Sequence, residues 1–171
     1  MERRVPEQLE TQRLLLRQFR EEDWGDLHAY CSSTEATRFT FGRELTEGDT
    51  WRALCSMLGH WQLRGYGPYA LEEKEASKVI GVCGFWFPND WPEPEIKWAL
   101  APEFWGRGYA SEAARAVQSA GREHLPEVHL ISLIHSENEP SKRLATAIGA
   151  TFSRVHRFRG ADYHIFRHPT G

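Results

Sequence analysis

The chain has 171 residues, a formal net charge of -3, and hydrophobic and charged fractions of 40% and 26%. These values predict one globular domain over residues 1–171 and argue against nucleic acid as a partner, because no basic surface is expected. The three cysteines, Cys31, Cys55 and Cys83, are widely spaced without a CxxC pair, so we expect free thiols, no disulfide framework and no metal site. No apolar run approaches the roughly 20 residues of a membrane span, and the N-terminus lacks the apolar core of a signal peptide. We therefore expect a cytoplasmic protein without a membrane partner.

Apolar periodicity and turn residues predict the elements in chain order. The first half of the chain favours a strand, two helices and three strands, at residues 13–19, 21–33, 45–65, 68–74, 79–87 and 95–101. The second half favours a helix, a strand, a helix and a final pair of strands, at residues 109–125, 128–135, 137–150, 151–158 and 161–168. Meandering strands imply antiparallel neighbours, and the strand–helix–strand unit that follows implies a parallel one. The order therefore predicts a mixed α/β (α+β) domain.

Several residues indicate where the helices begin, end and are buried. Thr46 with Asp49 resembles a capping box at the start of the second helix, and Gly65 suits its end. One face of that helix is apolar and is formed by Trp51, Leu54, Cys55, Leu58 and Trp61. Small residues on the third helix predict close packing against the sheet: Ala110, Ala113, Ala114, Val117 and Ala120. Asn138 is expected to cap the last helix and Gly149 to end it.

The stretch FWGRGYASEAA, residues 104–114, places two glycines directly before an alanine-rich helix. Glycine there costs backbone entropy, which is offset where backbone amides must approach an anion at a helix N-terminus. One interpretation is therefore a pyrophosphate site, and the other is a connection that only packs tightly. The GKS/T ending of a Walker A loop and the third glycine of a dinucleotide fingerprint are both absent from the stretch.

Two longer blocks carry a resemblance to a known family. EIKWALAPEFWGRGYASEAARA (residues 95–116) and ISLIHSENEPSKRLATAIGA (residues 131–150), with LETQRLLLRQFREEDWGDL near the start, resemble the GNAT superfamily of acetyl-coenzyme A-dependent N-acetyltransferases. The likeness runs from Leu9 to about Phe166, and within the superfamily it is to the branch that includes ribosomal-protein N-terminal acetyltransferases. It implies a mixed, mostly antiparallel central sheet of about six to seven strands with helices on both faces.

The resemblance also implies which residues hold coenzyme A. The family's phosphate-binding loop matches Trp105, Gly106, Arg107, Gly108, Tyr109 and Ala110, with tryptophan where the general pattern has Gln or Arg. The backbone amides of this loop would bind the pyrophosphate, while the arginine side chain either adds charge or is solvated. Asn138 and Ser141 match the family's second signature, in which Asn138 would cap the helix and also hydrogen-bond the pantetheine arm.

Acetyl transfer to an amine needs a base for the ammonium proton, a donor to the oxyanion and a stabiliser for the departing thiolate. For the oxyanion, the resemblance implies a bulged strand that frees backbone amides at Ala99, Leu100 and Ala101. For the thiolate, Ser141 is the positional candidate, and a water or an unassisted departure is the alternative.

Glu95 is the candidate base, acting through a water. It opens the strand at residues 95–101, and we expect burial among three tryptophans to raise its pKa. Those tryptophans are Trp86, Trp91 and Trp98. The alternative is a solvated carboxylate beside Lys97. His135, at the end of a predicted buried strand, ranks below Glu95 because a lone histidine is more often structural.

These residues predict an N-acetyltransferase that moves an acetyl group directly from acetyl-coenzyme A to a primary amine in a ternary complex, as a monomer or homodimer. Asp90, Glu93 and Glu95 beside Trp91 favour a cationic acceptor, such as a protein N-terminus, a polyamine or an amine-containing antibiotic; the alternative is a solvated acidic loop. Two other classes stay open: a catalytically silent domain that binds or senses acyl-coenzyme A, and an α/β domain without coenzyme. Turnover with an amine separates the enzyme from both.

Overall fold

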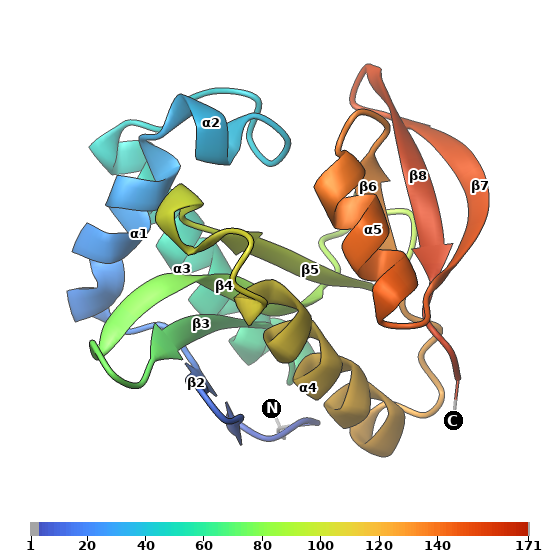
Figure 1. Cartoon of the computed structure of the whole chain (residues 1–171), viewed down its shortest axis with the longest axis horizontal. Coiled ribbons are helices and arrows are strands. Elements are labelled where there is room, and N and C mark those ends of the chain that lie inside the picture. The colour runs from blue at the N-terminus through green and yellow to red at the C-terminus, as the bar shows by residue number, and fades with distance from the viewer. Residues whose placement is uncertain (1–3, 171) are drawn as a thin grey trace.

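The structure, a computed structural model, describes residues 4–170 and is organised around one eight-stranded sheet with the order β1-β2-β3-β4-β5-β6-β8-β7 (Figure 1). The strands are β1 (Gln8–Glu10), β2 (Leu14–Arg17), β3 (Pro68–Glu73), β4 (Lys78–Trp86), β5 (Glu95–Leu100), β6 (Ile131–His135), β7 (Thr151–Phe158) and β8 (Ala161–Arg167). All neighbours pair antiparallel except β5 and β6. The expected mixed, mostly antiparallel sheet is therefore confirmed.

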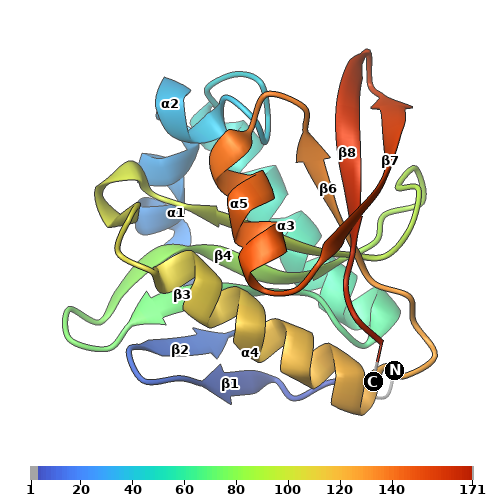
Figure 2. The ribbon, with the colours of Figure 1, turned by 45° about the vertical axis from the view of Figure 1, so that its right-hand side comes forward.

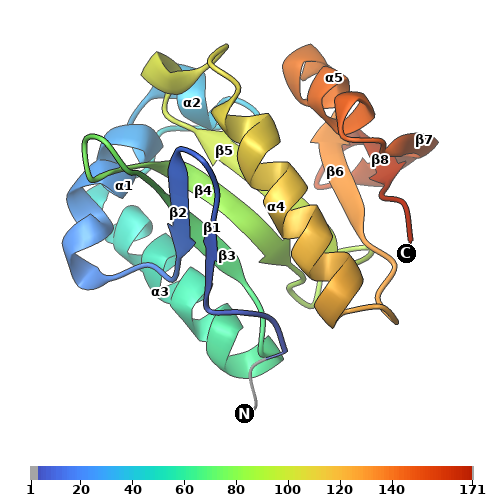
Figure 3. The ribbon, with the colours of Figure 1, turned by 60° about the horizontal axis from the view of Figure 1, so that its bottom comes forward.

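Helices cover both faces of the sheet (Figures 2 and 3). They are α1 (Trp24–Cys31), α2 (Thr34–Thr37), α3 (Glu47–Arg64), α4 (Tyr109–His124) and α5 (Glu139–Ala147), with short 3-10 turns at Glu21–Asp23 and Pro102–Phe104. α1 to α3 share one apolar cluster with β3 and β4, whereas α4 packs in a second cluster with β2 to β5. α5 lies beside α4 over β6 and β7. The sheet thus separates two hydrophobic layers.

Three predictions about elements were wrong in detail. The strand β1 was missed, because its three residues are too short to show alternation. The helix expected at 21–33 is present as a 3-10 turn, Glu21–Asp23, that runs directly into α1, which ends at Cys31. The separate helix α2 was not expected, and Ser33 caps it by accepting a hydrogen bond from the Ala36 amide. The buried face of α3 is formed by Thr50, Leu54, Met57, His60 and Trp61, whereas Trp51 and Cys55 are exposed. The true face is rotated around the helix from the predicted one.

Other local predictions are confirmed. Thr46 accepts a hydrogen bond from the Asp49 amide at 3.2 Å and caps α3, and Gly65 ends it in the left-handed region. On α4 the small side chains of Ala113, Ala114 and Val117 have no exposed area, so this helix lies close against the sheet.

β5 and β6 part immediately after they meet. Their ladder contains one residue pair, Glu95 with Ile131, and β6 then turns away from β5 (Figure 1). Beyond that pair, side chains replace the ladder: the Leu133 amide donates to Oε2 of Glu95 at 3.1 Å, and Oγ of Ser132 donates to the Ile96 carbonyl at 2.7 Å. The polar groups at the junction are therefore satisfied without closing the two strands together.

The spacing of β4 and β5 gives a stability prediction. A Cβ on Gly81 would lie 2.3 Å from the Ala99 carbonyl oxygen and 2.8 Å from Cα of Leu100, both backbone atoms of the neighbouring strand. Gly81→Ala should therefore lower the free energy of unfolding by about 1–3 kcal/mol through overpacking. The matched control Gly59→Ala, in α3 with no neighbour within 4 Å, should raise it by up to about 1 kcal/mol. Urea titration of both variants measures these free energies of unfolding. Equal changes in the two variants would show that β4 and β5 move apart at little cost to accommodate the added methyl group.

Candidate active site

A cavity of about 570 Å³ lies where β5, α2, the start of α4 and α5 meet. Nine residues predicted to bind a ligand line it: Ala99, Leu100, Trp105, Gly106, Gly108, Tyr109, Ala110, Asn138 and Ser141. Three other predicted site residues, Glu95, Ala101 and Arg107, are not part of its lining. The cavity therefore brings together two sequence blocks that are separated by a helix and a strand.

The glycine loop turns the chain from a 3-10 turn into α4. Gly106 and Gly108 have φ values of 71° and 82°, in the left-handed region that only glycine adopts readily. α4 starts at Tyr109, so the amides of its first turn have no carbonyl partner within the helix. These amides and the positive end of a 16-residue helix face the cavity, and the arrangement suits an anion.

Trp105, the residue that departs from the family's general pattern, anchors this loop. Its indole Nε1 donates to the Leu100 carbonyl at 2.7 Å and so ties the loop to the end of β5. The guanidinium of Arg107 lies 5.2 Å from the ring centre of Tyr109, and the residue is exposed.

The expectation of a bulge in β5 was wrong. β5 pairs with β4 in unbroken register, and the Ala101 amide donates to the Ile80 carbonyl at 2.9 Å, so it is not available to a ligand. Because amides alternate between the two edges of a strand, the Leu100 amide points to the opposite edge, toward β6. The ladder with β6 does not extend to Leu100. This edge of β5 is therefore open because β6 turns away from it, and not because β5 has a bulge.

Ser141 and Asn138 meet at the start of α5. Oδ1 of Asn138 accepts a hydrogen bond from the Ser141 amide at 3.2 Å, which confirms the predicted cap. Nε1 of Trp98 donates to Oγ of Ser141 at 3.2 Å. Since an indole can only donate, the hydroxyl proton of Ser141 remains free to donate elsewhere.

Glu95 lies at the point where β5 and β6 part, and its side chain is buried. Oε1 accepts from Nε1 of Trp91 at 2.9 Å and Oε2 accepts from the Leu133 amide. Burial raises the pKa of Glu95 to about 7, while the charge of Lys97 and the two hydrogen bonds oppose the rise. A carboxyl with this pKa exchanges protons readily near neutral pH.

Sequence reasoning gave Lys97 and Tyr163 no role at the site, although both lie near Glu95. The Lys97 ammonium lies 4.8 Å from the ring centre of Trp86, and burial lowers its pKa while Glu95 opposes this shift. Burial also raises the pKa of Tyr163, despite the nearby Arg159 charge. Lys97 lies two residues after Glu95 on β5, and residues two apart on a strand share a face of the sheet, so this neighbour could have been expected. Nothing in the sequence spacing links Tyr163 to Glu95.

The geometry does not favour His135 as the base. Its Nδ1 accepts a hydrogen bond from the Glu137 amide at 3.2 Å, and its ring lies 5.3 Å from those of Phe39 and Tyr163. Nδ1 is therefore already occupied, and the imidazole lies against two aromatic rings.

The sequence left two alternatives for the acidic residues beside Trp91, and in the structure two of the three carboxylates are paired with arginines. Asp90 forms an ion pair with Arg159, and Glu93 forms ion pairs with both Arg154 and Arg167. The arginines come from β7, β8 and the turn between them, far from the loop in sequence. The charges of Asp90 and Glu93 are therefore balanced by neighbouring arginines.

Two findings concern other classes of site. No group of three or more His, Cys, Asp or Glu side chains in residues 4–170 is arranged to hold a metal ion. Within the same range, no helix combines the length and apolar character needed to cross a membrane.

Comparisons with known proteins agree on one family. A sequence profile of the acetyltransferase (GNAT) domain matches residues 13–151. An uncharacterized N-acetyltransferase, p20 of Bacillus licheniformis, is 31% identical over 144 residues, which cover 83% of this chain and 81% of that protein. The crystal structure of an acetyltransferase from Agrobacterium tumefaciens superposes with a TM-score of 0.85 at 29% identity, over 97% of this chain and 95% of that one. The ribosomal L7/L12 alpha-N-protein acetyltransferase RimL, in complex with coenzyme A, shares the fold at 17% identity, with a TM-score of 0.77 over 97% of each chain.

The raised pKa of Glu95 predicts a pH dependence of stability. The folded value of about 7 exceeds the ordinary value of 4.5, so folding takes up a proton between these limits. The stabilisation is full below about pH 4.5 and is lost as the pH rises through about 7. Glu95→Gln cannot titrate, so the stability of the wild type relative to this variant should shrink as the pH rises from 4.5 to 8. Urea titrations across this range measure it, and a constant difference would contradict the raised pKa.

Proposed function

Since this chain belongs to the GNAT family of acetyltransferases, we propose that it transfers the acetyl group of acetyl-coenzyme A directly to a primary amine within a ternary complex. The observation that carries this proposal is the convergence, on one cavity, of the glycine loop, the open edge of β5 and the hydroxyl of Ser141. Glu95 lies at the start of the same strand, β5, with its pKa near 7.

The residues of the cavity fit coenzyme A. The amides of Gly106 to Ala110 would hold the pyrophosphate, where backbone donors tolerate the change of the preceding side chain to tryptophan. A Cβ on Gly106 would meet nothing within 4 Å, so space is open at that position of the loop. Asn138 and Ser141 line the far side, where the pantetheine arm would run between α4 and α5. The coenzyme supplies an activated thioester.

The open edge of β5 is suited to hold the thioester carbonyl. We assign the oxyanion donor to the Leu100 amide, which points toward the side that β6 has left. A backbone amide fixed in a strand needs no reorganisation as charge develops on the carbonyl oxygen, and one such donor typically contributes a hundredfold to a thousandfold in rate. The Ser141 hydroxyl would donate to the departing thiolate, because its lone pair already accepts from Trp98.

Glu95 would take the ammonium proton through a water, since its side chain is buried where β5 and β6 part and is not part of the cavity lining. A base with a pKa near the working pH combines a useful deprotonated fraction with useful basicity. A carboxyl whose pKa lies near neutral pH, together with a backbone donor for the oxyanion, favours an enzyme over a domain that only binds coenzyme A.

We propose a primary amine as the acceptor, and the ion pairs beside Trp91 bear on the charge that we expect it to carry. The carboxylates of Asp90 and Glu93 are neutralised by arginines, so the loop gives no advantage to a polycation. We propose a protein N-terminus or a small amine with a single charge. RimL, a ribosomal L7/L12 alpha-N-protein acetyltransferase of the same fold, supports the first of these.

The coenzyme site can be tested without knowing the acceptor. Acetyl-coenzyme A at millimolar concentration should raise the melting temperature of the wild type, because a ligand that binds only the folded state stabilises it. Gly108→Val should abolish the rise, since a β-branched residue is strained at a φ of 82° and would turn the loop. Gly160→Val, at a φ of 84° in the β7–β8 turn, carries the same strain and should keep the rise. If acetyl-coenzyme A raises the melting temperature of both variants equally, the loop has a packing role and does not bind the coenzyme.

The base can be tested with the best acceptor found in an amine screen that follows thiol release. Glu95→Gln should lower kcat roughly a hundredfold to ten-thousandfold at neutral pH and leave the KM for acetyl-coenzyme A nearly unchanged. The loss should shrink as the pH approaches the pKa of the amine, about 10 for an alkylamine, where free amine needs no base. pH–rate profiles of both proteins measure this, and superimposable profiles would remove Glu95 from the mechanism.

A further inference from the structure

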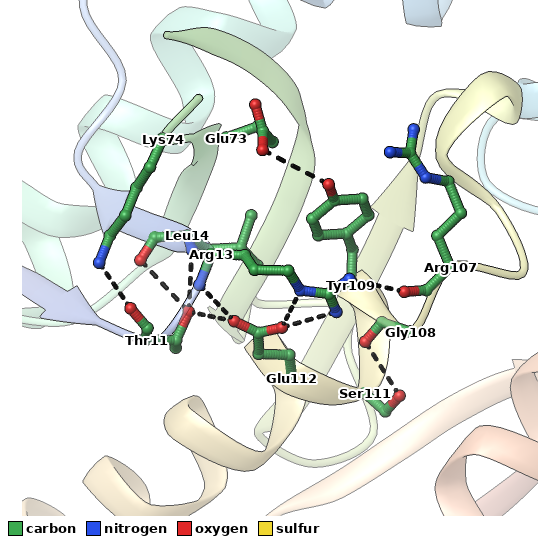
Figure 4. A network of polar contacts seen from close by, with 10 residues as sticks. All are labelled: Thr11, Arg13, Leu14, Glu73, Lys74, Arg107, Gly108, Tyr109, Ser111 and Glu112. Atoms are coloured by element: carbon green, nitrogen blue, oxygen red, sulfur yellow. Dashed lines mark hydrogen bonds and ion pairs between the residues drawn. The ribbon is translucent and has the colours of Figure 1, made fainter. Parts of the chain in front are cut away.

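A network from the N-terminal hairpin supports the glycine loop from outside the cavity (Figure 4). Arg13 stands in the turn between β1 and β2, far from the loop in sequence. Its Nη1 donates to the Arg107 carbonyl at 2.9 Å, and its Nε donates to Oε2 of Glu112 at 2.7 Å. Its guanidinium also lies 4.2 Å from the ring centre of Tyr109. One side chain thus binds the loop and the first turns of α4 together.

The bond to the Arg107 carbonyl determines where the next amide points. In a trans peptide the carbonyl of one residue and the amide of the next point in opposite directions. Fixing the Arg107 carbonyl on Arg13 therefore turns the Gly108 amide away from Arg13. This peptide joins Arg107 to Gly108, and Gly108 has a left-handed φ of 82° and lacks the side chain that would hinder the peptide from flipping. The orientation of the amide depends on the external bond.

The same network neutralises a charge that opposes anion binding. Glu112 lies in the first turn of α4, where a free carboxylate would repel a pyrophosphate. It accepts hydrogen bonds from Oγ1 of Thr11 at 2.7 Å and from the Arg13 amide at 2.8 Å, besides its ion pair with the Arg13 guanidinium. Partial burial raises the pKa of Glu112, but these bonds outweigh it, and the net pKa lies below the ordinary value. Glu112 is therefore ionised and engaged, and its charge is balanced.

We propose that Arg13 is a positioning residue of the coenzyme site, which keeps the Gly108 amide directed at the pyrophosphate by holding the Arg107 carbonyl. The inference rests on the proposed function, because it needs coenzyme A as the ligand. It assigns no contact between Arg13 and the coenzyme. A lysine at this position keeps the charge and an ion pair with Glu112, but it cannot span the carboxylate and the carbonyl together as the guanidinium fork does.

The test is the affinity of wild type and Arg13→Lys for three probes: coenzyme A, dephospho-coenzyme A and pantetheine. The first two carry the pyrophosphate and the third carries none. We expect Arg13→Lys to bind both pyrophosphate compounds about tenfold more weakly, the scale of one charge-assisted hydrogen bond, and pantetheine unchanged. Calorimetry serves for the nucleotides and ligand-observed NMR for pantetheine. The affinity for each pyrophosphate compound is divided by the affinity for pantetheine within the same protein. A change in the folded fraction therefore cancels in this ratio.

Arg4→Lys is the matched control. Arg4 also forms an ion pair with a glutamate, Glu127, and its guanidinium lies 5.5 Å from the ring centre of Tyr66. Its side chain is 41% exposed, against 38% for Arg13, but it holds no part of the loop. Arg4→Lys should bind all three probes as the wild type does.

Three results would overturn the proposal for Arg13. These are equal affinities in Arg13→Lys and wild type, an equal loss for pantetheine and the nucleotides, or a loss for coenzyme A alone. The last would mean a direct contact with the 3′-phosphate. A wild type that binds none of the probes would instead overturn the proposed function.

Discussion

The parting of β5 from β6 is the constraint on which the site depends. A parallel pair normally continues its hydrogen bonds along both strands, and here the ladder stops after Glu95 and Ile131. Side chains take over two of the missing bonds, Glu95 to the Leu133 amide and Ser132 to the Ile96 carbonyl. Without these substitutes, buried backbone groups at the junction would be left unsatisfied, at a cost of about 1–3 kcal/mol each.

His168 and Gln118 also support the junction between β5 and β6, through Ser132. Nε2 of His168 lies 2.9 Å from Oγ of Ser132, and Nδ1 of His168 lies 3.0 Å from Nε2 of Gln118 on α4. Burial lowers the pKa of His168 to about 4, so the ring is neutral at physiological pH and can donate at one nitrogen while accepting at the other. The separation of the strands is thus built into the polar network of the core.

The local features could be predicted because they depend on neighbours in sequence. Asn138 as a cap, Gly65 as a helix end and the glycine loop before α4 follow from backbone chemistry that short patterns reveal. For Glu95 the sequence left two alternatives open, burial among tryptophans or a solvated carboxylate, and the structure shows it buried and bonded to Trp91.

The rest depends on contacts between distant segments. Arg13 reaches Arg107 only because β2 and α4 pack together, and the arginines that neutralise Glu93 come from β7 and β8. The face of α3 was misjudged for the same reason: Trp51 is apolar enough for a core, but the sheet covers the side that carries Met57. The pattern of residues along the chain does not reveal which of these distant surfaces pack together.

The single residue pair between β5 and β6 also divides the sheet mechanically. β1 to β5 form a continuous five-stranded unit and β6, β8 and β7 a three-stranded one, which share only that ladder pair. The two units are also joined across the junction by the side chains of Glu95 and Ser132 and by the ion pairs of Glu93 with Arg154 and Arg167. The angle between the units is therefore set by side-chain contacts and one ladder pair, and a change of this angle would leave the ladders inside each unit intact.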